Sequence, residues 1–271
     1  LEAANALRGL NLDTAVVEFA PRLMPMQVDS EGGELLKEKI EALGVQVLTE
    51  RATQRIEPGD TSRLRMVFQD DKVLETDLIV FSAGIRPQDT LARECGLTIG
   101  ERGGVVIDDQ CRTNDPNILA IGEVALWNQS IFGLVAPGYQ MAKTAVATLT
   151  GGDTCFSGAD MSTKLKLLGV DVGSIGDAHG NQNPGARMFR YLDPLTQVYR
   201  KLVVTSDGKK LLGAMLVGDN SVYDTLLQYY ANGIELPKEP ASLILPQQSG
   251  AAPALGPDAL PETAMICSCH N

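Results

Sequence analysis

The stretch Thr113–Gly138, TNDPNILAIGEVALWNQSIFGLVAPG, decides the fold. After a polar run, the apolar segment Ile118–Ile121 predicts a buried strand, and Gly122 and Glu123 follow it directly. A glycine lets a ligand approach the backbone, and a carboxylate accepts hydrogen bonds from ligand hydroxyls. Because open α/β sheets bind ligands outside the carboxyl ends of their strands, Gly122 and Glu123 are candidate ligand contacts. The residues alone also fit a structural turn whose acid favours a helix dipole.

The composition is that of a globular protein with an acidic surface. The 271 residues carry a formal net charge of −11, which disfavours nucleic acid or an anionic membrane as a partner. The two histidines are too few for a histidine-built metal site. The five cysteines have an odd count and irregular spacing, which does not indicate a disulfide framework. A reducing, cytoplasmic compartment is therefore expected.

Residues 1–48 have the pattern of half a nucleotide-binding βαβ unit. An acid at the end of the second strand of such a fold accepts hydrogen bonds from the adenosine ribose and repels a 2′-phosphate. Glu18 lies at that point and favours NADH over NADPH, although Arg22 would soften the preference. A solvated glutamate remains the alternative, because the diagnostic Gly-rich turn is not in the chain. The predicted elements are a helix at Leu1–Arg8, a strand at Asp13–Glu18, a helix at Gly33–Leu43 and a strand at Val45–Leu48.

The next segment predicts strands and a tight exit from them. Alternating apolar residues in 52–76 predict an antiparallel β-meander. Leu78–Phe81 predicts a buried strand that runs into Ser82-Ala83-Gly84, where small residues let a ligand or another domain come close. A strand exit without any ligand fits these residues as well.

The chain then predicts a short helix at residues 88–96 and a strand at Gly103–Ile107. Pro137–Leu149 predicts a longer helix. Its residues Met141, Ala145 and Leu149 recur at four-residue spacing, which is typical of a face that packs on the core.

Together these motifs resemble the flavoprotein pyridine-nucleotide reductases. The strand followed by Gly122-Glu123 resembles their second FAD-binding signature, with Glu in place of the usual Asp. Ser82-Ala83-Gly84 resembles their Ala-Thr-Gly segment, which returns the chain from the NAD domain to the FAD domain. The resemblance implies an α/β fold class: a partial, glutathione-reductase-like fold with FAD and NAD(P) sites, followed by an α+β interface domain.

Longer strings narrow this resemblance. Residues 158–180 (GADMSTKLKLLGVDVGSIGDAHG), 211–219 (LLGAMLVGD), 242–246 (SLILP) and the terminal ICSCHN are similar to the large subunits of assimilatory NAD(P)H-dependent nitrite reductases. The chain starts without Met and stops after a Cys-x-Cys, so we expect an internal piece of a longer polypeptide. The expected domains are a partial NAD domain (1–84), the C-terminal part of an FAD domain (85–152), an interface domain (153–246), a flexible linker (247–265) and the start of a truncated [2Fe-2S] module (266–271).

The resemblance also implies a function and its residues. In the intact enzyme NADH or NADPH would reduce FAD, and iron–sulfur centres ([2Fe-2S], [4Fe-4S]) and sirohaem would reduce nitrite to ammonium. The expected partners are the small subunit and, through the interface domain, a second copy of the chain. No catalytic acid or base is predicted, since the cofactors carry the chemistry. The expected cofactor contacts are Glu2 and Gly84 near the nicotinamide, Glu18 at the NAD ribose, Gly122 and Glu123 at the FAD ribitol, Val135 and Ala136 at the flavin ring, and Cys267 and Cys269 at the cluster.

Two other interpretations stay open. One is a related flavoprotein reductase, such as the electron-transfer subunit of nitrate reductase or a rubredoxin reductase. The other is a non-catalytic interface or binding module, because the chain lacks the first FAD signature and half of the cluster ligands. We therefore expect the isolated chain to have no nitrite reductase activity and to bind FAD weakly or not at all.

Overall fold

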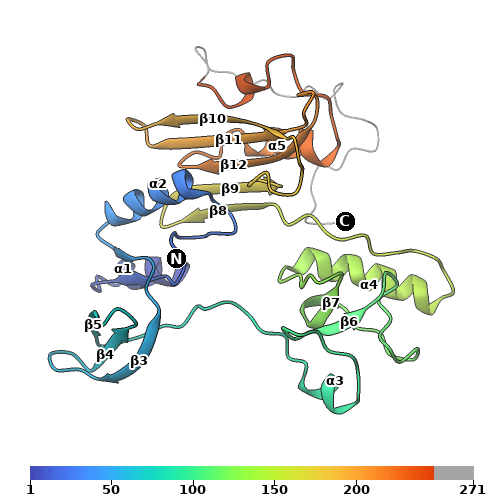
Figure 1. The fold of residues 1–271 in the computed structure, drawn as a ribbon, viewed down its shortest axis with the longest axis horizontal. Coiled ribbons are helices and arrows are strands. Elements are labelled where there is room, and N and C mark those ends of the chain that lie inside the picture. Colours follow the sequence, from blue (N-terminus) through green and yellow to red (C-terminus); the bar gives the residue numbers. More distant parts are fainter. Residues whose placement is uncertain (247–271) are drawn as a thin grey trace. The chain divides into compact units, whose positions relative to one another are not determined.

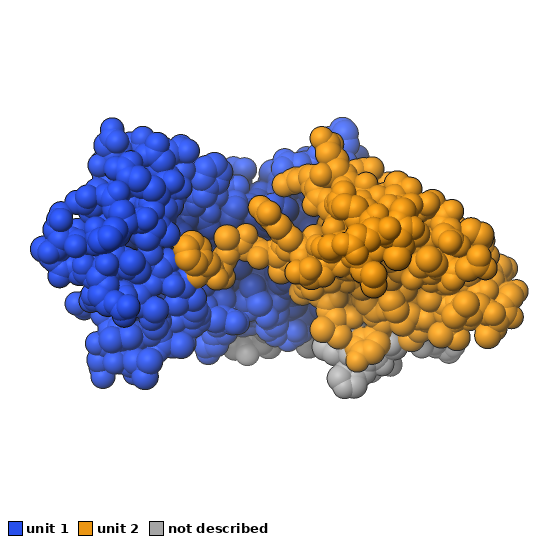
Figure 2. All heavy atoms as spheres, turned by 90° about the horizontal axis from the view of Figure 1, so that it is seen from below, with its two compact units in different colours: residues 1–80, 162–266 blue, residues 81–161, 267–271 orange. Residues whose placement is uncertain are grey.

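The computed structural model describes residues 1–246. These residues form two compact units. The first unit contains residues 1–80 and 162–246, and the second contains residues 81–161 (Figure 2). The predicted linker at 247–265 and the start of the [2Fe-2S] module at 266–271 lie outside the described residues.

The first unit begins with the predicted half of a βαβ unit. Helix α1 (Glu2–Gly9) leads to strand β1 (Ala15–Val17), and helix α2 (Ser30–Glu41) connects it to strand β2 (Gln46–Leu48). The two strands pair in parallel, with Ala15 opposite Gln46. Gly44 ends the helical region at φ +86°, a conformation that favours glycine. The sequence prediction is confirmed here, with shifts of a few residues at the ends.

The predicted β-meander is also present. Strands β3 (Thr53–Pro58), β4 (Leu64–Phe68) and β5 (Val73–Thr76) form a three-stranded antiparallel sheet. Met66 and Phe68, two of the alternating apolar residues, are buried.

A five-stranded antiparallel sheet completes the first unit. Its strands run in the order β10-β11-β12-β9-β8 (Figure 1). Strand-forming residues with turn signals between them predict four of these strands, at residues 164–168, 186–191, 197–205 and 211–218, whereas β9 was not predicted. The strands are β8 (Thr163–Leu167), β9 (Val170–Gly176), β10 (Arg187–Asp193), β11 (Val198–Val204) and β12 (Leu211–Val217).

This sheet is covered on both faces, which explains why β11 and β12 are almost continuously buried. Helix α2 packs on one face, and helix α5 (Tyr223–Ala231) packs on the other, where the 3-10 turn η2 (Pro240–Leu243) adds Leu243. Alternate strand residues divide between the two cores. Tyr199, Met215 and Val217 lie in the core with α2, and Leu202, Ala214 and Leu216 lie in the core with α5.

The second unit is smaller. A two-stranded parallel sheet of β6 (Val105–Ile107) and β7 (Ala125–Trp127) packs with helix α4 (Val135–Leu149). A short helix, α3 (Thr90–Glu94), precedes the sheet, and a 3-10 turn, η1 (Gly122–Val124), leads into β7. Met141 of α4 is fully buried in the core of this unit. The unit therefore presents the turn at Gly122 and the start of α4 on one small scaffold.

Two predicted strands are not formed. Leu78–Phe81 has no regular structure, and Leu78, Val80 and Phe81 are exposed, Phe81 by 74%. Ile118–Ile121 makes only an isolated bridge between Arg112 and Leu119. An extended apolar segment becomes a strand only where another strand offers hydrogen bonds, and no strand among residues 1–246 pairs with either segment.

The core face of α4 also differs from the prediction. Met141 and Ala145 are buried as expected, but Leu149 is 72% exposed. The next residue on the buried side is Thr148, whose hydroxyl donates a hydrogen bond to the Gln110 carbonyl at 2.9 Å. A spacing of 3.6 residues per turn takes the buried stripe from Ala145 to Thr148, because four-residue steps drift off that stripe.

Candidate functional site

The turn at Gly122 offers open backbone. Gly122 adopts φ +75°, and a Cβ at this position would meet no atom within 4 Å. Its N–H points to the sulfur of the buried Met141 at 3.2 Å, which ties the turn to α4. A Cβ on Gly138 would lie 3.7 Å from the Gly122 Cα, so the turn passes close to the first turns of α4. A planar ligand is therefore free to approach the backbone at this position.

Glu123 lies beside this open backbone. Its side chain is exposed, and residues 1–246 contain no cation in an ion pair with it. A Cβ on Gly133 would lie 3.3 Å from Oε1 of Glu123 and 3.0 Å from Cδ1 of Ile85. The carboxylate and the residue that follows Gly84 thus meet at Gly133. Gly84 itself is exposed at φ +84°, with no atom within 4 Å of a built Cβ.

The start of α4 has no side-chain cap. Leu134 occupies the N-cap position without a side-chain hydrogen bond, and the first turn contains no acid. Val135 and Ala136 are therefore the first two helical residues, whereas the predicted helix begins at Pro137. The first amides of a helix lack intrahelical acceptors and carry the positive end of the dipole. Since Pro137 has no N–H, the amides of Val135 and Ala136 are the donors available to an acceptor group.

The second unit therefore brings together most of the predicted FAD contacts. Gly122, Glu123 and the start of α4 lie around Gly138 and Gly133, and Gly84 is joined to them through Ile85. An open backbone, a carboxylate and two helix amides suit a ligand with hydroxyl groups and a carbonyl-bearing ring. Glu2 and Glu18 belong to the first unit.

Glu18 directly follows β1, and its backbone continues the hydrogen bonding between β1 and the β2 side. Its N–H donates to the Leu48 carbonyl at 2.8 Å, and its own carbonyl accepts from the Arg51 N–H at 3.0 Å. The half-buried side chain accepts a hydrogen bond from the Ala20 N–H through Oε1, at 2.8 Å. Its other carboxylate oxygen has no hydrogen-bond partner among residues 1–246. That oxygen is available to a ribose hydroxyl.

Arg22 has a role that sequence reasoning missed. Its Nε donates to the Val28 carbonyl at 2.9 Å, and Nη2 donates to the Pro25 carbonyl at 3.4 Å. The guanidinium thus donates two hydrogen bonds within its own loop. Gly33 makes room for the side chain, since a Cβ there would lie 2.9 Å from Cβ and Cδ of Arg22. The sequence shows an arginine four residues after Glu18, but it does not show whether this side chain contacts a ligand or its own loop.

Glu2 is the first residue of α1 and is exposed. It makes no hydrogen bond or ion pair within the part of the chain that the structure describes. Its predicted place near a nicotinamide therefore stays a prediction from the family resemblance.

Sequence reasoning also missed a charged network on α2. Asp29 caps the helix, with Oδ1 accepting from the Gly32 N–H at 3.1 Å. Its Oδ2 accepts from the Tyr199 hydroxyl at 2.8 Å and from the Lys201 ammonium at 3.0 Å. Burial favours a higher pKa for Asp29, but the Gly32, Lys201 and Tyr199 contacts outweigh it and lower the pKa below the usual value. An N-cap is readable from sequence, but partners in a distant strand are not.

The cysteines of the described residues do not form a redox or metal centre. Cys95, Cys111 and Cys155 are free thiols. Burial and the nearby Asp108 raise the pKa of Cys111 to about 11. Residues 1–246 contain no group of three or more His, Cys, Asp and Glu side chains able to hold a metal ion. Cys267 and Cys269, the predicted cluster ligands, lie outside the described residues.

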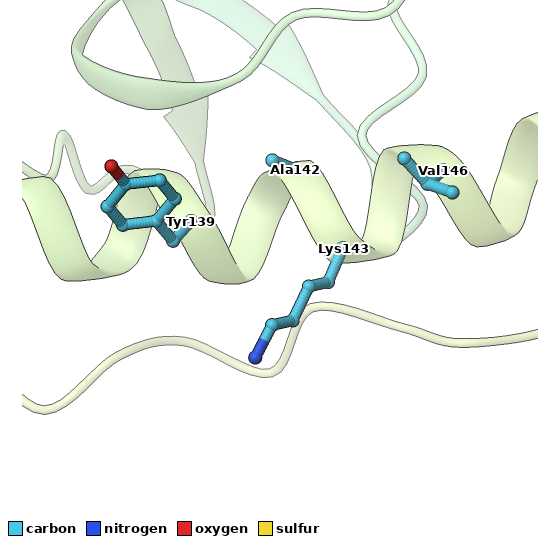
Figure 3. A pocket seen from close by; sticks show the side chains of 4 residues that line it. All are labelled: Tyr139, Ala142, Lys143 and Val146. Atoms are coloured by element: carbon cyan, nitrogen blue, oxygen red, sulfur yellow. The ribbon is translucent and has the colours of Figure 1, made fainter. Parts of the chain in front are cut away.

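A shallow hollow lies along α4. Figure 3 shows its lining residues, Tyr139, Ala142, Lys143 and Val146, in succession on one helix. A hollow lined by one helix encloses no ligand, and none of these residues belongs to the predicted FAD or NAD contacts. The candidate site is therefore the group of residues around Gly122 rather than this hollow.

Known proteins resemble the whole chain. It is 59% identical to the nitrite reductase [NAD(P)H] large subunit of Klebsiella oxytoca and 56% identical to the nitrite reductase (NADH) large subunit of Escherichia coli. Both alignments cover 100% of this chain but only 28% and 32% of the relatives. The predicted resemblance is thus confirmed, and the chain spans about a third of these relatives.

A solved structure and two sequence families agree with the fold class. The NAD-dependent persulfide reductase from A. fulgidus superposes with a TM-score of 0.69 at 26% identity, covering 83% of this chain and 45% of that one. Within residues 1–246, none of the helices has the length and apolar content needed to cross a membrane. Residues 162–234 match the rubredoxin NAD+ reductase C-terminal domain. Residues 1–148, more than half of the chain, match the pyridine nucleotide-disulphide oxidoreductase family. The chain belongs to this family.

Proposed function

We propose that the chain forms part of a nitrite reductase large subunit and supplies contacts to NADH and FAD in its electron-transfer region. The observation that carries the proposal is the open backbone of Gly122 beside the exposed carboxylate of Glu123 and the uncapped start of α4. These groups have the chemistry that a ribitol chain and a flavin ring require. The high identity to nitrite reductase large subunits supports the reaction class.

Each residue would contribute binding or orientation rather than acid–base chemistry. When bound, FAD accepts a hydride from NADH and passes electrons onward singly. Glu123 would accept hydrogen bonds from ribitol hydroxyls, and the Val135 and Ala136 amides would donate to the flavin ring. Gly84 would leave room on the nicotinamide side, where Glu2 is also expected.

The electron donor is proposed to be NADH. The carboxylate of Glu18 would accept a ribose hydroxyl and repel a 2′-phosphate. Arg22, the residue expected to soften this preference, already donates to the carbonyls of Pro25 and Val28. A 2′-phosphate would therefore meet the carboxylate of Glu18, while Arg22 is held in its own loop by these two hydrogen bonds.

The remaining centres belong to the proposal for the intact protein. Cys267 and Cys269 would supply half of a [2Fe-2S] site, and [4Fe-4S] and sirohaem would reside elsewhere. A small subunit and a second copy of the chain are the proposed protein partners. The free thiols Cys95, Cys111 and Cys155 favour a cytoplasmic location.

A related flavoprotein reductase is the second candidate. It is supported by the match of residues 162–234 to a rubredoxin reductase domain. The two candidates share the NADH and FAD sites and differ only in the acceptor. A non-catalytic interface module is the third candidate, and a measurement of FAD binding separates it from the other two.

FAD binding to the purified chain tests the proposal. The visible spectrum is recorded with increasing FAD, then with anaerobic NADH, for the wild type and for Glu123→Ala. Glu101→Ala, an exposed glutamate of the same unit, is the control. We expect weak flavin binding that Glu123→Ala lowers further, and no ammonium from nitrite. Equal FAD affinities in all three proteins would contradict the site, and sustained ammonium production would contradict the partial character of the chain.

A further inference from the structure

The segment between β1 and α2, called here the loop 19–28, follows Glu18 directly. Its first peptide is tied to the candidate ribose contact, because the Ala20 N–H donates to Oε1 of Glu18 at 2.8 Å. A shift of the loop therefore changes the orientation of the carboxylate. Met24 in this loop has φ +49°, a conformation that a non-glycine residue adopts only when its surroundings hold it.

The loop is held from within by Arg22 and from outside by the five-stranded sheet. The carbonyl of Met26 lies 3.0 Å from Nε2 of His179, in the segment after β9. Asp29, the first residue after the loop, accepts hydrogen bonds from Tyr199 and Lys201 of β11. Lys201 also donates to the His179 carbonyl at 3.4 Å, which joins the two contacts.

Because the residues that hold the loop 19–28 are buried, their contacts are satisfied in only one placement of the loop. Only 3% of the Lys201 side chain is exposed, so its ammonium has little access to water. Leu23 and Val28 of the loop lie in the same core as Tyr199 and are 2% and 0% exposed. An ammonium in that environment requires its carboxylate partner, and moving Asp29 away would leave a buried charge unpaired.

We infer that the five-stranded sheet holds the loop 19–28 in position, with His179, Tyr199 and Lys201 as positioning residues for NADH. The inference rests on the proposed NADH site at Glu18. The five-stranded sheet would then contribute to NADH binding at Glu18 as well as to the hydrophobic core. The sheet would keep the loop in the geometry that presents Glu18, so NADH would bind a loop that is already ordered.

Two variants remove single contacts without removing a buried side chain. His179→Ala deletes the partner of the Met26 carbonyl, and Tyr199→Phe deletes one donor to Asp29. His179→Gln keeps a side-chain donor and is expected to restore the loop. Lys164→Ala is the control, because it removes a pair between β8 of the same sheet and Asp224 of α5, on the face that α5 covers rather than the face that the loop covers.

Hydrogen exchange of the backbone amides tests the contact directly. In the 271-residue chain, peptides covering residues 19–28 should exchange faster in His179→Ala and Tyr199→Phe, with β11 and β12 unchanged. Titration with NADH then tests the function, by protein-bound nucleotide fluorescence. A loop that is ordered for only about a fifth of the time raises the apparent Kd about fivefold.

The outcomes separate the inference from the proposed function. Faster exchange with weaker NADH binding, both reversed in His179→Gln, is the expected result. Unchanged exchange in the loop, or faster exchange with unchanged NADH affinity, would overturn the inference. If the wild-type chain binds no NADH at saturating concentration, the proposed NADH site fails, whereas the exchange of residues 19–28 still decides whether the sheet holds the loop.

Discussion

The carboxylate of Asp29 lies 3.0 Å from the ammonium of Lys201, although the two residues are 172 positions apart. Asp29 begins α2 of the nucleotide-binding half, and Lys201 belongs to β11 of the C-terminal sheet. The pair therefore joins two sequence domains inside one compact unit. It is a buried charge pair, for which the removal of one partner is costly.

Replacing Lys201 with Met should destabilise the chain by about 3 kcal/mol, because Asp29 is left charged and largely buried. Urea unfolding followed by circular dichroism measures this. Lys164→Met, at an exposed pair, should change the free energy of unfolding by less than about 0.5 kcal/mol. The double variant Asp29→Asn/Lys201→Met should recover part of the loss. Equal effects of Lys201→Met and Lys164→Met would contradict the importance of burial.

Gly33 of α2 leaves room for the side chain of Arg22. A Cβ on Gly33 would lie 2.9 Å from two Arg22 carbons. Gly33→Ala should therefore destabilise the protein by about 1–3 kcal/mol, through overpacking. The matched control is Gly9→Ala in α1, where a Cβ meets nothing within 4 Å. That change should be neutral or stabilising by up to about 1 kcal/mol, from helix propensity alone. Thermal unfolding of both variants decides between these effects.

The parts of the fold that the sequence predicts well are those with local causes. Apolar spacing and Gly44 locate α2, and alternation locates the meander β3–β5. Each pattern needs only neighbours that are close in the chain. The open backbone at Gly122 and the exposed carboxylate of Glu123 also follow from the residues themselves, and their contact with a ligand stays a prediction.

The predictions that were wrong and the contacts that were missed mostly depend on residues that are distant in the sequence. Leu78–Phe81 and Ile118–Ile121 have strand composition, but a strand needs a partner, and composition does not reveal whether one is present. The contacts of Arg22 and Asp29 depend in the same way on tertiary packing. Leu149 was misplaced because a four-residue step was extended to the helix end, where the true period of 3.6 matters.

An alanine at Gly122 would both strain the backbone and block the approach of FAD, and a second glycine allows these two effects to be separated. Gly122 and Gly151 both have positive φ, and a Cβ on either would meet nothing within 4 Å. Alanine at either position should cost about 1–2 kcal/mol of stability, from the left-handed conformation. Only Gly122→Ala should also weaken FAD binding, measured by the change in flavin fluorescence. Equal FAD affinities in the two variants would place the ligand elsewhere.

The described cysteines should differ sharply in reactivity. Cys111 is fully buried, and its pKa is raised to about 11, so the nucleophilic thiolate is scarce at pH 8. Cys95 and Cys155 are exposed. Iodoacetamide at pH 8 followed by peptide mass mapping should label Cys95 and Cys155 within minutes and leave Cys111 unmodified until the protein is unfolded. Labelling of Cys111 in the folded chain at the rate of Cys95 would contradict its burial.

Asp177 gives the fold a dependence on pH. Its carboxylate accepts hydrogen bonds from the N–H groups of Gly180, Asn181 and Gln182 and from the Asn183 side chain, at 2.9–3.0 Å. Burial favours a higher pKa for Asp177, but the hydrogen bonds, with Asn183 first, outweigh it and lower the pKa. The folded state therefore prefers the ionised form. This stabilisation is complete above the usual aspartate pKa of about 4 and is lost as pH falls through the lowered value.

Asp177→Asn should cost about 1–3 kcal/mol at pH 7, because one acceptor oxygen becomes a donor among donors. The difference between wild type and variant should shrink as the pH is lowered from 5 toward 2, since protonated Asp177 also loses an acceptor. Urea unfolding at a series of pH values measures this, with Asp13→Asn, at an exposed position, as the control. A difference that stays constant down to pH 2 would mean that the Asp177 charge does not stabilise the turn, and that the Asn183 contact acts through shape alone.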